Sequence, residues 1–325
     1  MPVTPRSFAL LQPIAYEMSQ RPGMVYTQQQ SIGSATRPDG KSINMLDMFG
    51  LDRCLGRFGL AIDEDWQCNS AIGYAITGQV AITQTPSMCP TFTQDFMEQQ
   101  AGMLQTQLGG QAKCPMILIQ QGAGRTSVTQ HANVSADAKY PNSPGIVTMN
   151  PHLVYDVKGL MHSAIRYGGP VAYIFYSSQS SADIADEPFV VPIGKGQILK
   201  EGTDLTIYGH PPASVEIEKA LPLLEKEGIK AEYFDPRTLK PFDVTGLAAS
   251  LTKTKRLFCV DFGNYTHCFS MSVMAMSAMA APGTKMFLLG YPDAPAPFST
   301  AMNRWNIPDA AKIVDAVKKF MAATK

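Results

Sequence analysis

Apolar positions along the chain alternate between helical spacing and short continuous runs. From Phe8 to Met18 they recur at intervals of three and four residues, which predicts an amphipathic helix, and Arg21-Pro22-Gly23 predicts its end. The run Met116-Ile117-Leu118-Ile119 is typical of a strand that a parallel sheet buries on both faces. The same criteria predict helices over 66–76, 92–107 and 154–166 and strands over 24–26, 80–82 and 170–176. This alternation favours an α/β fold.

The pattern is interrupted once, between residues 177 and 187, where Ser, Gln, Asp and Ala follow one another without periodicity. A second α/β pattern comes after this break, with strands expected over 205–208, 231–234 and 257–261 and helices over 214–227 and 309–321. A chain of 325 residues is about long enough for two ordinary domains. We therefore predict one domain over residues 1–186 and a second over residues 187–325.

Two of the helical stretches have unusual compositions. Ala71, Gly73 and Ala75 are small, and they predict that the helix over 66–76 is buried against a neighbouring helix. Met271, Met274 and Met279 fall on one face of a further helix, for which packing in the core is a better explanation than a groove for a partner.

Charge and composition exclude several classes of function. Lys plus Arg and Asp plus Glu number 27 each, so no long-range field favours nucleic acid or an anionic membrane surface. No apolar run reaches the roughly 18 residues of a membrane-spanning helix. The six cysteines form no zinc-binding pattern, and we interpret them as reduced, mostly buried thiols of a cytoplasmic protein. Only 17% of residues are charged, which suggests that another subunit covers part of the surface.

Several strings resemble the β subunits of 2-oxo acid dehydrogenases, the family of the pyruvate and branched-chain decarboxylase components. The C-terminal string, residues 232–243, reads Glu-Tyr-Phe-Asp-Pro-Arg-Thr-Leu-Lys-Pro-Phe-Asp and is the most specific. In the first half, Ile62-Asp63-Glu64 before a small-residue helix and the pair Gln130-His131 are similar to the family's pattern. The resemblance implies a transketolase-like fold, with a pyrimidine-binding domain over 1–186 and a transketolase C-terminal-like domain over 187–325.

The resemblance also implies thiamine diphosphate as the cofactor. In such enzymes a carboxylate beside the pyrimidine ring nitrogen drives the aminopyrimidine into the imino form that deprotonates the thiazolium carbon. Glu64 is the residue that matches this role. Without the resemblance, Glu64 would be interpreted as a helix N-terminal glutamate that the helix dipole favours.

Three more residues receive roles from the same resemblance. Ile62 is expected to pack on the pyrimidine and Phe92 to stack on it, with ordinary core packing as the alternative for Phe92. His131 is expected to face the reacting carbon and to exchange a proton with the substrate, with a structural hydrogen bond as its alternative.

The family divides its cofactor site between two chains. Its α subunit supplies the diphosphate site and the Mg²⁺ ligands through a Gly-Asp-Gly motif, which this sequence lacks. We therefore expect an α2β2 heterotetramer that decarboxylates a 2-oxo acid, or cleaves a related ketone, and passes the acyl or enamine intermediate to a lipoyl group or a carbonyl acceptor. A lipoyl acyltransferase is a further expected partner. The alternatives are the C-terminal half of a split transketolase and a non-catalytic scaffold subunit.

Some positions depart from the family pattern. The arginine that usually follows the strand over 116–119 is replaced by Gln120 or Gln121, and the aspartate after Ile165-Arg166 is replaced by Tyr167. Charges near the expected site have thus become neutral groups. These departures put the family's monovalent-cation site in question for this chain and leave the substrate open.

Overall fold

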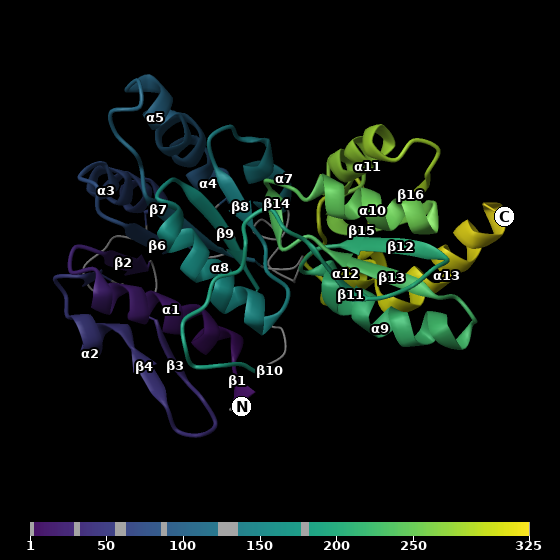
Figure 1. Cartoon of the computed structure of the whole chain (residues 1–325), viewed down its shortest axis with the longest axis horizontal. Coiled ribbons are helices and arrows are strands. Elements are labelled where there is room, and N and C mark those ends of the chain that lie inside the picture. The colour runs from purple at the N-terminus through teal and green to yellow at the C-terminus, as the bar shows by residue number, and fades with distance from the viewer. Residues whose placement is uncertain are drawn as a thin grey trace. The chain divides into compact units, whose positions relative to one another are not determined.

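The structure, a computed structural model, describes residues 3–28, 33–55, 63–85, 90–122, 136–176 and 182–324 (Figure 1). The chain divides into two compact units. The first contains Met1–Gly122 and Lys139–Ile193, and the second contains Ala123–Ala138 and Gly194–Lys325. The domain limits of 1–186 and 187–325 stay a prediction.

The first unit is built on a parallel sheet with the strand order β8-β9-β7-β6-β2-β5. The strands are β8 (Val147–Met149), β9 (Val171–Phe175), β7 (Met116–Gln121), β6 (Ala81–Thr85), β2 (Val25–Gln28) and β5 (Cys54–Leu55). All residues of β6 and β9 are buried, as expected for strands covered on both faces. Thr85 pairs with Gln120, so β6 and β7 end at nearly the same level.

Helices cover both faces of this sheet. On one face α1 (Arg6–Gln20) packs beside α8 (Val154–Tyr167), and their apolar side chains join the strands in one core (Figure 1). On the other face α3 (Glu64–Ile76) lies beside a continuous helix, which is made of α4 (Pro90–Asp95), the π-helical turn η1 (Phe96–Ala101) and α5 (Gly102–Gln107).

Short elements complete this half of the sequence, and most of them carry too few apolar residues to show a period. They are β1 (Val3–Thr4), β3 (Ser34–Thr36), β4 (Ser42–Asn44), α2 (Met45–Phe49), α7 (Ala136–Lys139), η2 (Tyr140–Asn142) and β10 (Ala182–Asp183).

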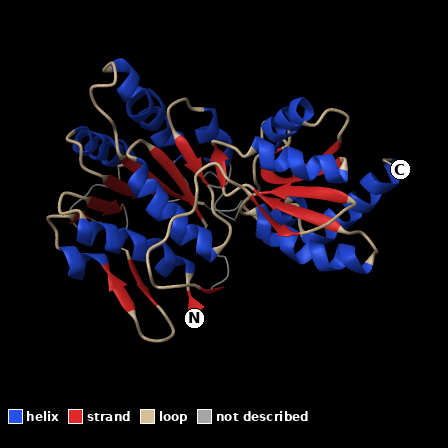
Figure 2. Cartoon of the chain, viewed as in Figure 1, coloured by secondary structure: helices blue, strands red, loops and turns tan. Residues whose placement is uncertain are grey.

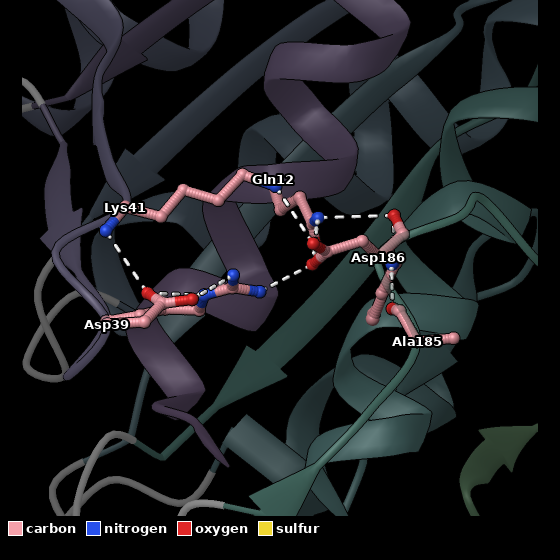
Figure 3. Close-up of polar contacts among 7 residues, drawn as sticks. Gln12, Asp39, Lys41, Ala185 and Asp186 are labelled. Carbon is pink, nitrogen blue, oxygen red and sulfur yellow. Dashed lines mark hydrogen bonds and ion pairs between the residues drawn. The ribbon is translucent and has the colours of Figure 1, made fainter. Parts of the chain in front are cut away.

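Asp186, near the end of the first unit, is held in place by several cations (Figure 3). Its carboxylate pairs with Arg37, a nearly buried side chain, and with Lys41 at 3.0 Å. The ammonium of Lys158 donates to the carbonyls of Ala185 at 2.6 Å and Asp186 at 2.8 Å. Burial lowers the pKa of Lys158 to about 8. The segment that leaves the first unit is therefore anchored to it by charged and buried groups.

The second unit is a five-stranded sheet in the order β11-β13-β12-β15-β16. The strands are β11 (Gln197–Lys200), β13 (Ala231–Asp235), β12 (Leu205–Gly209), β15 (Arg256–Asn264) and β16 (Lys285–Tyr291). All neighbouring pairs are parallel except β11 with β13. The unit also contains β14 (Thr238–Lys240) and α12 (Thr300–Asn306).

Helices also lie on both sides of the second sheet. Figure 2 shows α9 (Ala213–Lys226) and α13 (Ala310–Ala323) on one side, and α10 (Val244–Thr254) and α11 (Phe269–Ala280) on the other. The strand side chains alternate accordingly. Leu205 and Ile207 of β12 join the core with α9 and α13, whereas the hydroxyl of Thr206 contacts Ser250 of α10 at 2.6 Å. The long periodic elements match the sequence-based predictions to within a few residues.

One prediction about helix burial holds in part and another is wrong. The helix α3 is buried at Ala71 and Ala75, as expected, but a Cβ at Gly73 would meet no atom within 4 Å and Trp66 is 44% exposed, so only one side of the helix is buried. The methionines of α11 do not form its core face, because Met279 is 84% exposed. Val273 and Ser277, spaced by one helical turn, are buried instead.

The remaining general expectations concern cysteines and membrane spans. The described cysteines are free, buried thiols: Cys54, Cys68, Cys114, Cys259 and Cys268. Cys89 lies outside the described residues. In the part of the chain that the structure describes, no helix is both long enough and apolar enough to cross a membrane.

Candidate functional site

The carboxyl ends of the strands form the edge of a parallel sheet where α/β proteins bind ligands. In the first unit, Gln28, Thr85, Gln121 and Phe175 end β2, β6, β7 and β9. A helix that links two parallel strands starts at this edge and runs back towards the other. Because α3 follows β5 and α4 follows β6, the first turns of both helices belong to the carboxyl edge.

Glu64 is the first residue of α3. The preceding residue, Asp63, caps the helix, and its carboxylate accepts a hydrogen bond from the backbone N–H of Trp66 at 2.9 Å. Glu64 is half-buried, and it lies at the positive end of the helix dipole, which favours an ionised carboxylate. The sequence order thus brings an anionic hydrogen-bond acceptor to the carboxyl edge. A contact between Glu64 and a cofactor and a favourable interaction of Glu64 with the helix dipole can both hold at this position.

Of the other expected site residues, the structure describes Phe92 but not Ile62 or His131. Phe92 lies in the first turn of α4 and is 55% exposed, so core packing within this chain, the alternative explanation for it, is wrong. Ile62 and His131 lie outside the described residues, and their roles stay predictions.

A buried polar network, which sequence reasoning missed, connects the ends of β6 and β7 to α4. The side-chain oxygen of Gln120 accepts from the hydroxyls of Tyr140 at 3.2 Å and Thr85 at 3.3 Å, and the Tyr140 hydroxyl lies 2.6 Å from that of Thr93. All four side chains have no measurable exposure. We call these four residues the edge network. Buried polar groups with satisfied hydrogen bonds fix a single geometry.

The edge network explains one departure from the family pattern. Gln120 stands at the end of a continuous apolar strand, and its neighbours in the network are neutral hydroxyl groups. A buried arginine would need a compensating charge, whereas a neutral amide is satisfied by these hydroxyls. One sign of this network is present in the sequence, a glutamine directly after an apolar run. The other three members of the network come from three other segments of the chain.

A second neutral group lies nearer the end of β2. The hydroxyl of Tyr26 is 2.8 Å from the side-chain oxygen of Gln84 and 3.1 Å from that of Gln28. Burial raises the pKa of Tyr26 far above its usual value, so this phenol is neutral at physiological pH. Amide and hydroxyl groups therefore dominate the described part of this edge.

Arg6 of α1 fixes the other end of the edge. Its guanidinium is buried and donates to the carbonyls of Pro151 at 3.0 Å, of His152 and of Tyr176 at 2.8 Å. These carbonyls follow β8 and β9 directly. Arg6 holds the two strand ends together, and its donors are used for backbone carbonyls.

The groups at this edge suit a neutral heteroaromatic ring better than a phosphate. A carboxylate at the start of α3, amide side chains and the exposed ring of Phe92 can bind ring nitrogens and an aromatic face. Among the described residues of the edge, Arg6 is a buried cation, but carbonyls occupy its donors. The described groups of this edge therefore suit a neutral heteroaromatic ring.

Comparisons with known proteins agree with this picture. Residues 194–313 match the family model of the transketolase C-terminal domain. The β subunit of the acetoin:2,6-dichlorophenolindophenol oxidoreductase of Cupriavidus necator is 27% identical, over 98% of this chain and 97% of that protein. The mitochondrial pyruvate dehydrogenase E1 component subunit beta-1 of Oryza sativa subsp. japonica is 28% identical, over 93% and 83%.

A solved structure supports the expected fold. An inactive β4 tetramer of a split-gene transketolase superposes with a TM-score of 0.76, with 97% of each chain covered and 18% sequence identity. This likeness confirms the transketolase-like fold. At that identity it carries no information about substrate.

Proposed function

We propose, from the premise that this chain is a diverged member of the 2-oxo acid dehydrogenase β-subunit family, that it carries the cofactor-activating half of a thiamine-diphosphate enzyme. Relatives of this family depend on that cofactor. The observation that carries the proposal is the position of Glu64 at the start of α3, on the carboxyl edge of the first sheet.

Glu64 would hold a proton between its carboxylate and a pyrimidine ring nitrogen. The Asp63 cap keeps the backbone at the start of α3 in place, and the helix dipole favours the carboxylate beside the ring. When bound, thiamine diphosphate supplies a nucleophilic carbon that attacks an oxo carbon and accepts the electrons released by decarboxylation.

The neighbouring residues would position the ring and the substrate. Phe92 offers an exposed aromatic face, and the edge network holds the first turn of α4, to which Phe92 belongs, through Thr93. Ile62 would pack on the ring. His131 would donate a proton to the substrate oxygen or remove one, and its loop follows β7, which ends at the same edge.

An α-type partner would complete the site. The partner would supply the Mg²⁺ ligands and the diphosphate contacts, in an α2β2 assembly. The use of Arg6 for backbone carbonyls supports this division, since the described edge then has little charge to offer a phosphate. The relatives act on acetoin in one case and are pyruvate dehydrogenase subunits in another, so we propose a small 2-oxo acid or a related ketone as the substrate.

Reconstitution with an α-type chain tests the proposal. The two chains are produced separately and mixed with thiamine diphosphate and Mg²⁺, and turnover of pyruvate, longer 2-oxo acids and acetoin is followed by reduction of an artificial electron acceptor. We expect turnover only with both chains and the cofactor. Turnover of ketose phosphates in their place would favour a split transketolase, and a complex that assembles without any turnover would favour a scaffold.

A further inference from the structure

The second unit contains a buried cluster of ionisable groups, which we call the His210 cluster: Asp137, His210 and Asp261. Each offers one ligand atom, and these atoms lie within 4.8 Å of one another. All three side chains are buried, with exposed fractions of 1–2%. The cluster lies at the carboxyl ends of two adjacent parallel strands, because His210 directly follows β12 and Asp261 lies in β15.

The contacts of the cluster leave one carboxylate oxygen of Asp137 open among the described residues. The Nε2 atom of His210 is 2.6 Å from Oδ2 of Asp137, and its Nδ1 atom is 3.1 Å from the Tyr208 hydroxyl. The second carboxylate oxygen of Asp137, Oδ1, is buried and has no hydrogen-bond partner among the described residues. A buried carboxylate oxygen without a donor or a cation is costly, so this oxygen is a candidate position for a bound cation.

Asp261 is held in a fixed orientation. Its Oδ1 atom accepts from the backbone N–H of Gly263 at 2.7 Å, and its Oδ2 atom accepts from the N–H and hydroxyl of Ser270 at 3.0 and 2.7 Å. Oδ1 therefore retains a lone pair for an ion, and such outer contacts orient metal-binding carboxylates.

Carboxylates predominate among the described residues around the cluster. Asp235, which ends β13, is also fully buried and contributes to the same electrostatic environment as His210. Three carboxylates and one imidazole thus share this buried region, where the rings of Phe242 and Phe269 pack beside Tyr208 and His210. A divalent cation would offset part of this negative charge.

We propose that the His210 cluster binds a divalent transition-metal ion through Asp137, His210 and Asp261. The mixed nitrogen and oxygen ligands favour Zn²⁺ or Mn²⁺ over Mg²⁺, which prefers oxygen ligands and retains its waters. The three residues belong to the second unit, whereas Glu64 belongs to the first, and the Mg²⁺ of the proposed function is expected on the α-type partner. Its ion would hold the ends of β12 and β15 to the segment that contains Asp137.

Metal titration of the full chain tests this inference. The chain is stripped with a chelator, and Zn²⁺, Mn²⁺ or Mg²⁺ is added while binding and the midpoint of thermal unfolding are measured. We expect about one Zn²⁺ or Mn²⁺ per chain, a raised midpoint with either ion, and no comparable effect of Mg²⁺. An unchanged midpoint together with no stoichiometric Zn²⁺ or Mn²⁺ would overturn the proposal and leave a buried His–Asp ion pair.

Matched variants locate the ion. Asp137→Asn keeps the shape and an acceptor for His210 but removes the charge, and His210→Gln removes the imidazole. Both are expected to reduce the bound ion from about one per chain to nearly none, whereas His267→Gln, at an exposed histidine, is expected to retain it. Loss of the ion in His267→Gln with retention in Asp137→Asn would overturn the assignment.

Cobalt gives a readout that needs no variant. Co²⁺ bound to the wild-type chain by carboxylate and imidazole groups shows visible d–d absorption without thiolate-to-metal charge transfer. Strong charge transfer would assign the ion to cysteines and contradict the proposal. Neither measurement involves thiamine diphosphate, so its failure would leave the proposed function untouched.

Discussion

Phe92 and its neighbour Thr93 show how sharply environment changes between adjacent residues of one helical turn. Phe92 is 55% exposed, whereas Thr93 is fully buried and contacts Tyr140. A large aromatic side chain that faces outward beside a fixed polar network is well placed to meet a ligand or another chain. The sequence alone could not distinguish this position from a core residue, because aromatic residues are common in both.

Replacing Phe92 by alanine tests whether this side chain contacts the cofactor in the complex. We expect the free energy of unfolding of the isolated chain to change by no more than about 0.5 kcal/mol, because the side chain buries little surface within it. In the reconstituted complex, the concentration of thiamine diphosphate that gives half-maximal activity is expected to rise about tenfold, since a good aromatic stack contributes roughly 0.5–1.5 kcal/mol beyond the area it buries.

Tyr167→Ala is the matched control, because Tyr167 is 48% exposed but ends α8, at the opposite edge of the sheet. A cofactor requirement that changes equally in both variants would contradict the role of Phe92.

The edge network connects two strands to α4 and η2. A substitution in it therefore shows whether the positions of these elements matter for the site. Tyr140→Phe removes the hydroxyl that lies between Gln120 and Thr93 and leaves both without that partner. We expect a loss of about 1–3 kcal/mol in the free energy of unfolding, measured by denaturant titration. Because α4 then loses its link to β7, activity of the complex should also fall.

Tyr173→Phe provides the comparison. It too removes one buried hydroxyl, which donates to the carbonyl of Val157 at 2.7 Å. That contact lies between β9 and α8, away from α4. Tyr173→Phe is expected to lower stability by a similar amount with little change in kcat. Equal losses of kcat in the two variants would mean that the network has no special relation to the site.

The contact between α1 and α8 should make stability depend on pH. Glu17 is buried, and its carboxylate accepts from Nδ1 of His162 at 2.8 Å, from Arg166 at 2.7 Å and from Arg21 at 3.1 Å. Burial would raise the pKa of Glu17, but these hydrogen bonds outweigh it and the pKa is lowered. Burial lowers the pKa of His162 below its usual value of 6.5, despite the opposing effect of Glu17.

Both shifts reduce stability as the pH falls, but in different ranges. Below pH 6.5 the unfolded chain takes up the His162 proton before the folded chain does, so stability declines until the lowered pKa of His162 is passed. The contribution of Glu17 is complete above its usual pKa of 4.5 and is lost as the pH falls through its lower folded value.

His162→Asn keeps a donor near Glu17 but cannot titrate, so it should flatten the decline between pH 6.5 and 4.5. Denaturant titrations across this range measure the effect, with the exposed His267→Asn as control. A wild-type slope that His162→Asn leaves unchanged would contradict this assignment.

Elements were predictable where one face or both faces are continuously apolar. Helices α1, α8, α9 and α13 and strands β7, β9 and β12 have this property, and the sequence predicts each of them within a few residues. The strand β16 was not predicted, although it contains the apolar run Met286-Phe287-Leu288-Leu289; most of its side chains are only partly buried. The helix α10 begins at the Asp243 cap with a glycine in its first turn, which hides its period.

At the scale of the whole molecule, the fold and the resemblance to a family were accessible from sequence, but the assembled polar clusters were not. Glu64 could be chosen because it belongs to a short local pattern. The edge network and the His210 cluster each unite residues that are far apart in sequence, and no spacing rule connects Asp137 with Asp261. Such clusters become visible only when parallel strands bring their ends to one edge.

The proposed ion of the His210 cluster and the proposed role of Glu64 have separate consequences for the whole protein. Loss of an ion from the His210 cluster would lower the stability of the second unit, whereas loss of Glu64 would stop cofactor activation in a complex that still assembles. Stability and activity measured on the same samples therefore distinguish them.

The most direct test of the central claim is the rate at which the reactive carbon of bound thiamine diphosphate exchanges its proton for deuterium in the reconstituted complex. Glu64→Gln keeps the size and the helix start but removes the carboxylate. We predict that exchange and turnover fall about 10²- to 10⁴-fold while assembly is unchanged, as expected for loss of an acid–base group. Exchange within a few-fold of the wild-type rate would contradict the account and favour a scaffold role for this chain.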